Sequence, residues 1–428
     1  SFSPEADAYV DSSLPTTNYG RGLAIRVDGF PTVRSYLRFR VTGAGLPITR
    51  ALLRVYANSA SSSGISLLPV SDNTWSETGI TFANAPLPGS QAALSGAVAA
   101  GTWKILDVTS LVSGDGLFSF ALGTPGSTAI SLASRESGAN APQLVLTFPA
   151  PAVLLAAGDI ARCGGGTSTP APGSGAQITS DLLLNASGSL FTLGDNSNDS
   201  GSLDEYINCF GPTWGRLKDR LTPAMGNHDI IADNQGGPYF SYFGAPAHPE
   251  SFGHFSLDLG AWHIVVLNAE CAVGGQGCGA GSPQETWLRG DLAAHPGKCI
   301  LAIWHQPLFT SGTQSGYTEM RAFWQALYDY HADIILNGHN HNYERFAPQD
   351  PFANSDPANG VREFVVGTGG ASLDASSFPL AANEEVRSTA AYGYLKLSLY
   401  PGSYTWQFIP QPGSIFTDSG SSTCHQGS

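Results

Sequence analysis

The sequence predicts an all-β sandwich over residues 1–149, followed by an α/β domain over residues 150–428 in which two mixed sheets are flanked by helices. Residues 1–149 hold short β-type runs separated by Gly, Ser, Asn and Pro, without helical periodicity. After residue 150, apolar strands alternate with helices and are then joined by further strands, which is typical of stacked sheets with helical covers. A short, stiff Pro/Ala junction at residues 149–152 separates the two domains.

Several runs in the first domain alternate apolar and polar side chains, as strands with one buried face do. Tyr36-Leu37-Arg38-Phe39-Arg40 shows this pattern most clearly. Strands are expected at residues 23–27, 35–41, 51–57, 65–70, 104–108, 118–121 and 143–148.

In the second domain, helices are expected at residues 176–186, 203–210, 283–292 and 318–330. The aromatic segment 236–244 is expected to form a wall near a site. Further strands are expected at residues 153–157, 190–193, 221–225, 252–257, 261–267, 300–304, 332–335, 364–366, 392–399 and 404–408.

The charge is distributed unevenly. Residues 1–150 carry nine acidic and nine basic side chains, so the remaining 25 acidic and 11 basic ones account for the net charge of −14. An acidic second half lacks the basic footprint that nucleic-acid binding needs, although a small phosphorylated substrate remains compatible with bound cations. No run approaches the roughly 18 apolar residues of a membrane span, so none is expected.

Six cysteines without a Cys-x-x-Cys pair indicate disulfides in an oxidising compartment, and we expect a secreted mature chain whose signal peptide has been removed. Six cysteines allow fifteen connectivities. Cys271 and Cys278 bracket a glycine-rich loop and are the best pair, after which Cys163–Cys209 and Cys299–Cys424 would follow. A Cys163 thiolate ligand remains an alternative, because this residue lies close after Asp159.

Polar ligand types follow five apolar runs. Two histidines two residues apart after a glycine can point into one crevice, but such a pair alone is a weak signal. Sites in such sheets form beyond the carboxyl ends of the strands, so we expect the five ends to meet. Oxygen and imidazole ligands without thiolate suit Zn, Mn or Fe, and there are enough of them for two ions. The candidate ligands are Asp159, Asp195, Asn227, His305, His339 and His341.

The ordered set Gly158-Asp159, Gly194-Asp195, Gly226-Asn227-His228-Asp229, His305 and Gly338-His339-x-His341 resembles the calcineurin-like metallophosphoesterases. The string Gly-His-x-His-x-Tyr-Glu-Arg, from Gly338 to Arg345, is most similar to the purple acid phosphatase branch. The resemblance covers about residues 150–428 and implies a four-layer α/β sandwich.

The resemblance implies two metal ions, divalent or trivalent. Asp159 and His341 would hold the first ion, Asp195 would bridge both, and Asn227, His305 and His339 would complete the second. A hydroxide between the ions would attack phosphorus. His228 would then assist the leaving group, with Asp229 orienting His228.

This chain departs from the family at three places. The purple branch has a tyrosine ligand where Asn198 stands, so we expect no purple colour, with Asn198 as a weak ligand or water in its place. Ala161 stands where other members have a histidine. Gln314 and Ser315 lie where further histidines are usual, which leaves more of the leaving-group protonation to His228, with Tyr317 as a second candidate.

Residues 1–149 resemble bacterial jelly-roll modules named for a DNRLRE signature, which occur on secreted enzymes and are in part classed as carbohydrate-binding. A polysaccharide partner and a spacer role both remain open, as does a structural calcium ion. Trp75 and Trp103 could stack on a sugar ring, although a tryptophan in a small sandwich is more often core. The segments that carry the resemblance are Asp7-Ala8-Tyr9-Val10, Asn18-Tyr19-Gly20, Tyr36-Leu37-Arg38-Phe39, Ala51-Leu52-Leu53-Arg54-Val55-Tyr56, Thr74-Trp75-Ser76-Glu77 and Leu106-Asp107-Val108-Thr109.

Together these observations predict a secreted phosphatase that hydrolyses phosphate monoesters. A phosphodiesterase of the same fold is the nearest alternative. A sugar-binding surface protein with an inert second domain is the alternative from another class.

Overall fold

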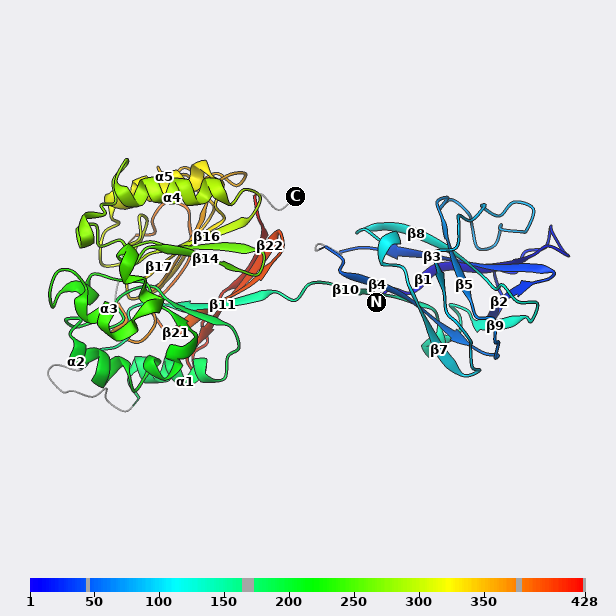
Figure 1. Ribbon diagram of the computed structural model, residues 1–428, viewed down its shortest axis with the longest axis horizontal. Coiled ribbons are helices and arrows are strands. Elements are labelled where there is room, and N and C mark those ends of the chain that lie inside the picture. Colours follow the sequence, from blue (N-terminus) through cyan, green and yellow to red (C-terminus); the bar gives the residue numbers. More distant parts are fainter. Residues whose placement is uncertain (44–46, 164–172, 375–378, 426–428) are drawn as a thin grey trace. The chain divides into compact units, whose positions relative to one another are not determined.

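The computed structural model describes residues 1–43, 47–163, 173–374 and 379–425. The chain divides into two compact units, Ser1–Ala150 and Pro151–Ser428. Figure 1 traces the first unit in blue and cyan and the second from green to red. Each unit has a hydrophobic core of its own.

The first unit contains only antiparallel pairings among its described strands. The strand order is β10-β4-β9-β2-β3-β8-β5-β6, with β1 on β3 and β7 on β4. The strands are β1 (Pro4–Asp11), β2 (Ala24–Gly29), β3 (Thr32–Val41), β4 (Arg50–Ala57), β5 (Ser66–Val70), β6 (Ala93–Leu94), β7 (Thr102–Asp107), β8 (Gly116–Gly123), β9 (Ile130–Ala133) and β10 (Gln143–Thr147).

This sheet curls so that both of its halves contribute to one core. On β4, Leu53 and Val55 are fully buried, whereas the intervening Arg54 faces outward. Leu37 of β3 and Leu132 of β9 lie in the same cluster. The two-residue alternation of strands therefore fills the interior, and the predicted β-sandwich is confirmed.

The second unit contains two sheets, ordered β13-β12-β11-β21-β22-β23 and β14-β15-β16-β17-β19-β18-β20. Their strands are β11 (Ala152–Ala157), β12 (Ser189–Thr192), β13 (Leu221–Thr222), β14 (Phe255–Leu259), β15 (Trp262–Val266), β16 (Cys299–Ile303), β17 (Ile334–Asn337), β18 (Tyr343–Phe346), β19 (Arg362–Val366), β20 (Glu384–Ser388), β21 (Gly393–Tyr400), β22 (Ser403–Pro410) and β23 (Ser419–Thr423). The helices are α1 (Gly175–Leu184), α2 (Leu203–Glu205), α3 (Gly237–Phe243), α4 (Pro283–Ala294) and α5 (Arg321–Asp329).

The two sheets pack face to face, with helices on their outer faces (Figure 1). Successive residues of β15 show why. Ile264 and Val266 lie in the cluster shared by both sheets, whereas Val265 packs with Leu288 of α4 and Phe323 of α5. Every β15 residue is buried, and its side chains are apolar except for that of His263, which pairs with Asp291. The predicted layering of two sheets between helices is confirmed.

Two predicted strands differ from the structure. The strand expected at residues 221–225 ends after Thr222, where Pro223 removes a backbone donor. The strand expected at 252–257 begins only at Phe255, because Phe252 and Gly253 have positive φ angles of 53° and 85°. The aromatic segment 236–244, for which a wall near a site was expected, contains helix α3; its place beside a site stays a prediction.

The six cysteines form the three expected disulfides, Cys163–Cys209, Cys271–Cys278 and Cys299–Cys424. Cys163 is therefore not available as a thiolate ligand. Within the described residues, every helix is too short or too polar to cross a membrane.

Candidate metal centre

The candidate ligands lie just beyond the strands that precede them. Asp159 follows β11 and Asp195 follows β12, both in the first sheet, whereas His305 follows β16 and His339 follows β17 in the second sheet. Asn227 arrives on the loop after β13. Parallel pairing of β11 with β12 and of β16 with β17 brings the carboxyl ends of each pair to the same edge. The site is therefore built where the ends of the two sheets meet.

Three of these residues adopt a left-handed backbone conformation. The φ angles are 59° at Asp159, 51° at Asp195 and 71° at His339. Non-glycine residues rarely adopt this region, and such strain is concentrated at functional sites. Each of the three residues lies within three positions of the end of the preceding strand, so the backbone turns there.

Glycines next to the ligands leave the space that the ligands occupy. A Cβ atom on Gly226 would lie 2.3 Å from Oδ1 of Asp195, and one on Gly194 would lie 2.4 Å from Nδ1 of His305. A Cβ atom on Gly338 would lie 2.7 Å from Oδ2 of Asp159. The Gly-x pattern in the sequence therefore has a steric cause, because backbone and ligands approach too closely for any side chain.

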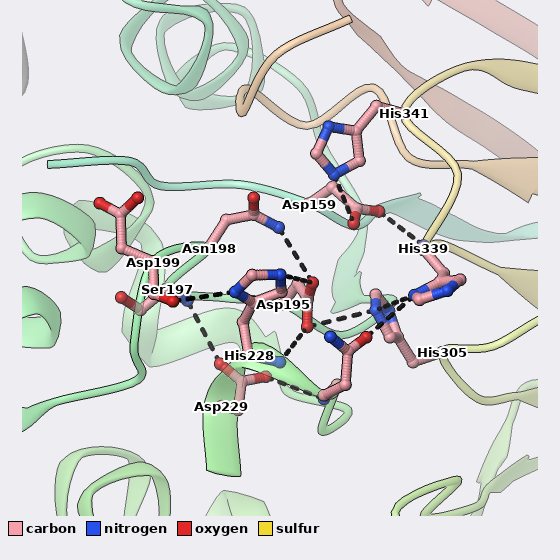
Figure 2. A network of polar contacts seen from close by, with 12 residues as sticks. Asp159, Asp195, Ser197, Asn198, Asp199, His228, Asp229, His305, His339 and His341 are labelled. Carbon is pink, nitrogen blue, oxygen red and sulfur yellow. Dashed lines mark hydrogen bonds and ion pairs between the residues drawn. The ribbon is translucent and has the colours of Figure 1, made fainter. Parts of the chain in front are cut away.

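The six candidate ligands form one network of contacts, and Figure 2 labels all of them except Asn227. Nε2 of His341 lies 3.3 Å from Oδ1 of Asp159, and the amide of His339 donates to Oδ2 of Asp159 at 2.8 Å. Nε2 of His305 lies 3.2 Å from Oδ1 of Asp195. Nδ1 of His339 lies 2.9 Å from Oδ1 of Asn227 and 3.3 Å from Nε2 of His305. The structure thus brings together all six side chains that the sequence singled out.

Burial and neighbouring charges shift the pKa values of three candidate ligands. Burial raises the pKa of Asp195, but the charges of His305 and His228 outweigh it and lower this pKa to about 2. Burial lowers the pKa of His305, yet Asp195 and Asp159 raise it to about 10. Burial and the nearby His305 lower the pKa of His339 to about 3, so this imidazole is neutral. The anionic carboxylate of Asp195 and the neutral imidazole of His339 are in the protonation states that metal ligands need, whereas His305 would release a proton on binding a metal ion.

The donor set fits a cation. Asp159, Asp195 and His305 each offer one oxygen or nitrogen atom to a metal ion, and these three atoms lie within 4.8 Å of one another. All three residues are buried. Nε2 of His339 is buried without a hydrogen-bond partner among the described residues, and Oδ1 of Asp159 has only the ion-pair contact with His341. Buried polar atoms normally have hydrogen-bond partners. Lone pairs that no hydrogen bond uses at this site therefore suit metal ligation.

His228 is held differently from the expectation. Its Nδ1 lies 2.9 Å from the backbone carbonyl of Asp199, and its Nε2 lies 3.8 Å from Oδ2 of Asp195. The expectation that Asp229 orients His228 is wrong for this structure. Asp229 instead accepts from the amides of Asn196 and Gly226 and from the hydroxyl of Tyr206. It therefore connects the loop that carries Asp195 with the loop that carries Asn227.

The departures from the family pattern have local partners. The side-chain amide of Asn198 donates to Oδ2 of Asp195 at 3.0 Å, so it positions this carboxylate. Gln314 donates to the carbonyl of His339 at 3.1 Å. The ring of Tyr317 meets the ring of His339 edge-on at 5.0 Å between centroids. These three side chains therefore lie around the site and contact its candidate ligands Asp195 and His339.

Three neighbours of the site were not found from the sequence. Ser372 places its hydroxyl 3.2 Å from Nδ1 of His341, Asp199 supplies the carbonyl that holds His228, and Arg162 contacts both Ser372 and Asp199. The Gly-Thr-Gly-Gly run after β19 was an available signal for Ser372, because it repeats the pattern of an apolar strand followed by glycine. No local pattern marks the other two.

The first unit contains an acidic cluster of Asp7, Glu77 and Glu136. Arg135 already occupies it, with its Nε 3.2 Å from Glu77 and 2.9 Å from Glu136 and its backbone amide 2.7 Å from Asp7. Because this guanidinium supplies the positive charge, the cluster gives no support to the structural calcium ion.

Comparison with known proteins agrees with these features. Residues 148–343 match the calcineurin-like phosphoesterase family, and residues 1–148 match carbohydrate-binding module family 96. The chain therefore carries a calcineurin-like phosphoesterase domain, which follows a carbohydrate-binding module in the sequence.

The phosphoesterase domain is similar to purple acid phosphatases. Purple acid phosphatase 15 of Arabidopsis thaliana is 32% identical over 151 residues, which cover 31% of this chain and 27% of that protein. Purple acid phosphatase 23 of the same plant is 33% identical over 153 residues, covering 31% and 32%. The chain thus spans about a third or less of the length of these relatives.

A solved structure shares the fold. Purple acid phosphatase PPD1 from yellow lupin (Lupinus luteus) superposes with a TM-score of 0.53 at 15% identity, covering 94% of this chain and 74% of that one.

Proposed function

We propose that this chain is a secreted, binuclear-metal phosphatase that hydrolyses phosphate monoesters. One observation carries the proposal. Six oxygen and imidazole donors from five strand ends converge on one buried network, and His228 lies beside it. The similarity to purple acid phosphatases supports the same reaction class.

Asp159 and His341 would hold one ion, Asp195 would bridge, and Asn227, His305 and His339 would hold the other. When bound, two such cations would lower the pKa of an intervening water to near 7 and offset the charge on the phosphoryl oxygens. Fe, Zn and Mn all suit these donors.

His228 assists the departing oxygen in this proposal. Its Nδ1 proton is donated to the carbonyl of Asp199, so Nε2 is the atom that faces the ligands. A ring that carries both protons can donate from Nε2 to the leaving group.

The test combines metal analysis with activity. Mass spectrometry of the purified protein should find close to two metal ions per chain, and p-nitrophenyl phosphate should be hydrolysed. Removal of metal by a chelator should abolish turnover, and Zn, Mn or Fe should restore it. Full activity in a metal-free preparation would overturn the proposal. Faster hydrolysis of bis(p-nitrophenyl) phosphate than of the monoester would favour the phosphodiesterase alternative.

Binding of a polysaccharide by residues 1–149 is the second proposed function, because residues 1–148 match a carbohydrate-binding family. Trp75 is only 7% exposed and belongs to the core, whereas Trp103 lies half-buried on the outer face of β7. Trp103 is therefore the better stacking candidate. Retention of the full chain, but not of residues 150–428, on insoluble polysaccharides tests this function.

Secretion is supported by the three disulfides. Recovery of the protein with intact disulfides from the culture medium of its source would test it.

A further inference from the structure

Arg162 lies three residues beyond Asp159, beside the candidate metal centre. Its Nε is 3.4 Å from Oδ1 of Asp199, and its Nη1 is 3.3 Å from the hydroxyl of Ser372. Both partners also touch the site. The Asp199 carbonyl holds His228, and the Ser372 hydroxyl lies 3.2 Å from His341. Arg162 therefore links the part of the site that contains His228 with the part that contains His341.

The guanidinium has capacity for another ligand. Its side chain is 50% exposed, and both of its contacts are long for charge-assisted hydrogen bonds. Among the described residues, no contact is found for Nη2. Asp199 is already engaged through Oδ2, which accepts from the amide of Cys163 at 2.7 Å. A further pair of acceptor oxygens can therefore be bound without breaking a tight ion pair.

Other arginines of this unit are committed elsewhere. Arg216 pairs with Asp181 at 2.6 Å, Arg289 with Asp329 at 2.8 Å and Arg345 with Asp418 at 2.7 Å. These are close ion pairs outside the site. Arg162 differs from them because its loosely held partners are neighbours of the candidate ligands.

We propose that Arg162 binds the terminal oxygens of the phosphoryl group and gives the enzyme its preference for monoesters over diesters. This inference rests on the proposed phosphatase function and deepens it. A monoester offers one more terminal oxygen and one more negative charge than a diester. A guanidinium fork matches two such oxygens, and it is worth less when one of them carries a second ester group.

The test compares Arg162→Gln and Arg162→Lys with the parent protein, all loaded with metal. For Arg162→Gln, kcat/KM with p-nitrophenyl phosphate should fall about tenfold to a hundredfold, mainly through KM. With bis(p-nitrophenyl) phosphate it should change by less than about threefold. Arg162→Lys should recover part of the loss, since it restores charge but not the planar fork.

A binding measurement supplies a readout that does not depend on turnover. Calorimetric titration of the metal-loaded protein with inorganic phosphate should show about tenfold weaker binding in Arg162→Gln. Arg216→Gln is the matched control, because it removes a guanidinium paired with Asp181 outside the site. It should leave phosphate binding and both activities unchanged.

Equal losses toward monoester and diester, or loss of bound metal in Arg162→Gln, would overturn the inference, because either result assigns Arg162 to the support of the site. Unchanged phosphate binding would also overturn it. Failure of the proposed function is a separate result: the parent protein would hydrolyse neither ester.

Discussion

In residues 1–150, the buried carboxylate of Asp7 lies beside Arg135 and accepts a hydrogen bond from the amide of that residue. In residues 151–428, Asp159, Asp195 and Asp229 are buried together near four histidines, and no arginine or lysine is among their described hydrogen-bond and ion-pair partners. Among the described residues, Asp7 has a hydrogen-bond partner and a cationic neighbour in Arg135, whereas Nε2 of His339 in the second arrangement is buried without a hydrogen-bond partner. The contrast indicates that buried charge alone does not mark a site. A site is indicated where buried charges at strand ends lie beside buried ligand atoms that have no hydrogen-bond partner.

The largest expected effect comes from removing the carboxylate at the centre of the second arrangement. Asp195→Asn should lose bound metal and reduce kcat/KM for p-nitrophenyl phosphate at least about a thousandfold, because an amide cannot neutralise two cations. Asp291→Asn is a matched control, since Asp291 also binds an imidazole, that of His263, but outside the site. Retained metal and activity in Asp195→Asn would remove the basis of the proposed centre.

The next effect separates proton donation from metal binding. His228→Asn should keep the metal content but lower kcat about a hundredfold to a thousandfold, because the leaving oxygen loses its donor. An exposed histidine, His331, supplies the control variant His331→Asn, which retains a residue that tolerates the φ angle of 56° found there. A kcat within about twofold of the parent value in His228→Asn would show that this ring has no part in the chemistry.

The ligands could be predicted from the sequence because each follows an apolar run directly. Gly158-Asp159 after β11 and Gly338-His339 after β17 are local signals, and parallel pairing turns that local order into a shared edge. The sandwich of the first unit could be predicted for the same reason, because the alternation along β4 is also a local pattern.

The groups that orient the ligands could not be predicted in the same way. The family resemblance implied that Asp229 orients His228, yet the ring of His228 contacts the carbonyl of Asp199, across 29 positions. Arg162 reaches Ser372 over 210 positions. Such contacts depend on how loops close after folding, and no periodicity records that. The strand expected from residue 252 begins only at Phe255, because the backbone turns at Phe252 and Gly253.

Two tryptophans of the first unit should respond differently to truncation. Trp75 packs against Tyr36 and donates from Nε1 to Ser119 at 3.1 Å, so Trp75→Ala should lower the free energy of unfolding of this unit by about 3–5 kcal/mol. Trp103 is half-buried beneath Arg54, and Trp103→Ala should cost about 1 kcal/mol while weakening retention on polysaccharide. Hydrogen exchange of residues 1–150 in the full chain measures the two changes in unfolding free energy, and a column of insoluble polysaccharide measures retention. Unchanged retention would exclude Trp103 as the stacking residue.

The smallest expected effect tests how completely Arg135 satisfies the buried charge of the first unit. Burial, opposed by the Arg135 amide and reinforced by Glu136 and Glu77, raises the pKa of Asp7 to about 7. A carboxyl whose pKa is higher in the folded state stabilises that state while protonated. This stabilisation is complete below about pH 4 and is lost as the pH rises through about 7.

The unfolding free energy of the first unit should therefore fall between pH 4 and pH 7, by an amount of the order of 2–4 kcal/mol. Asp7→Asn, which keeps an acceptor for the Arg135 amide, should flatten this dependence, whereas Asp28→Asn at a local turn should leave it intact. Hydrogen exchange of residues 1–150 at several pH values measures the slope. An equal slope in Asp7→Asn and the parent would mean that Arg135 keeps Asp7 ionised in the folded unit, so that both units bury carboxylates in their charged form.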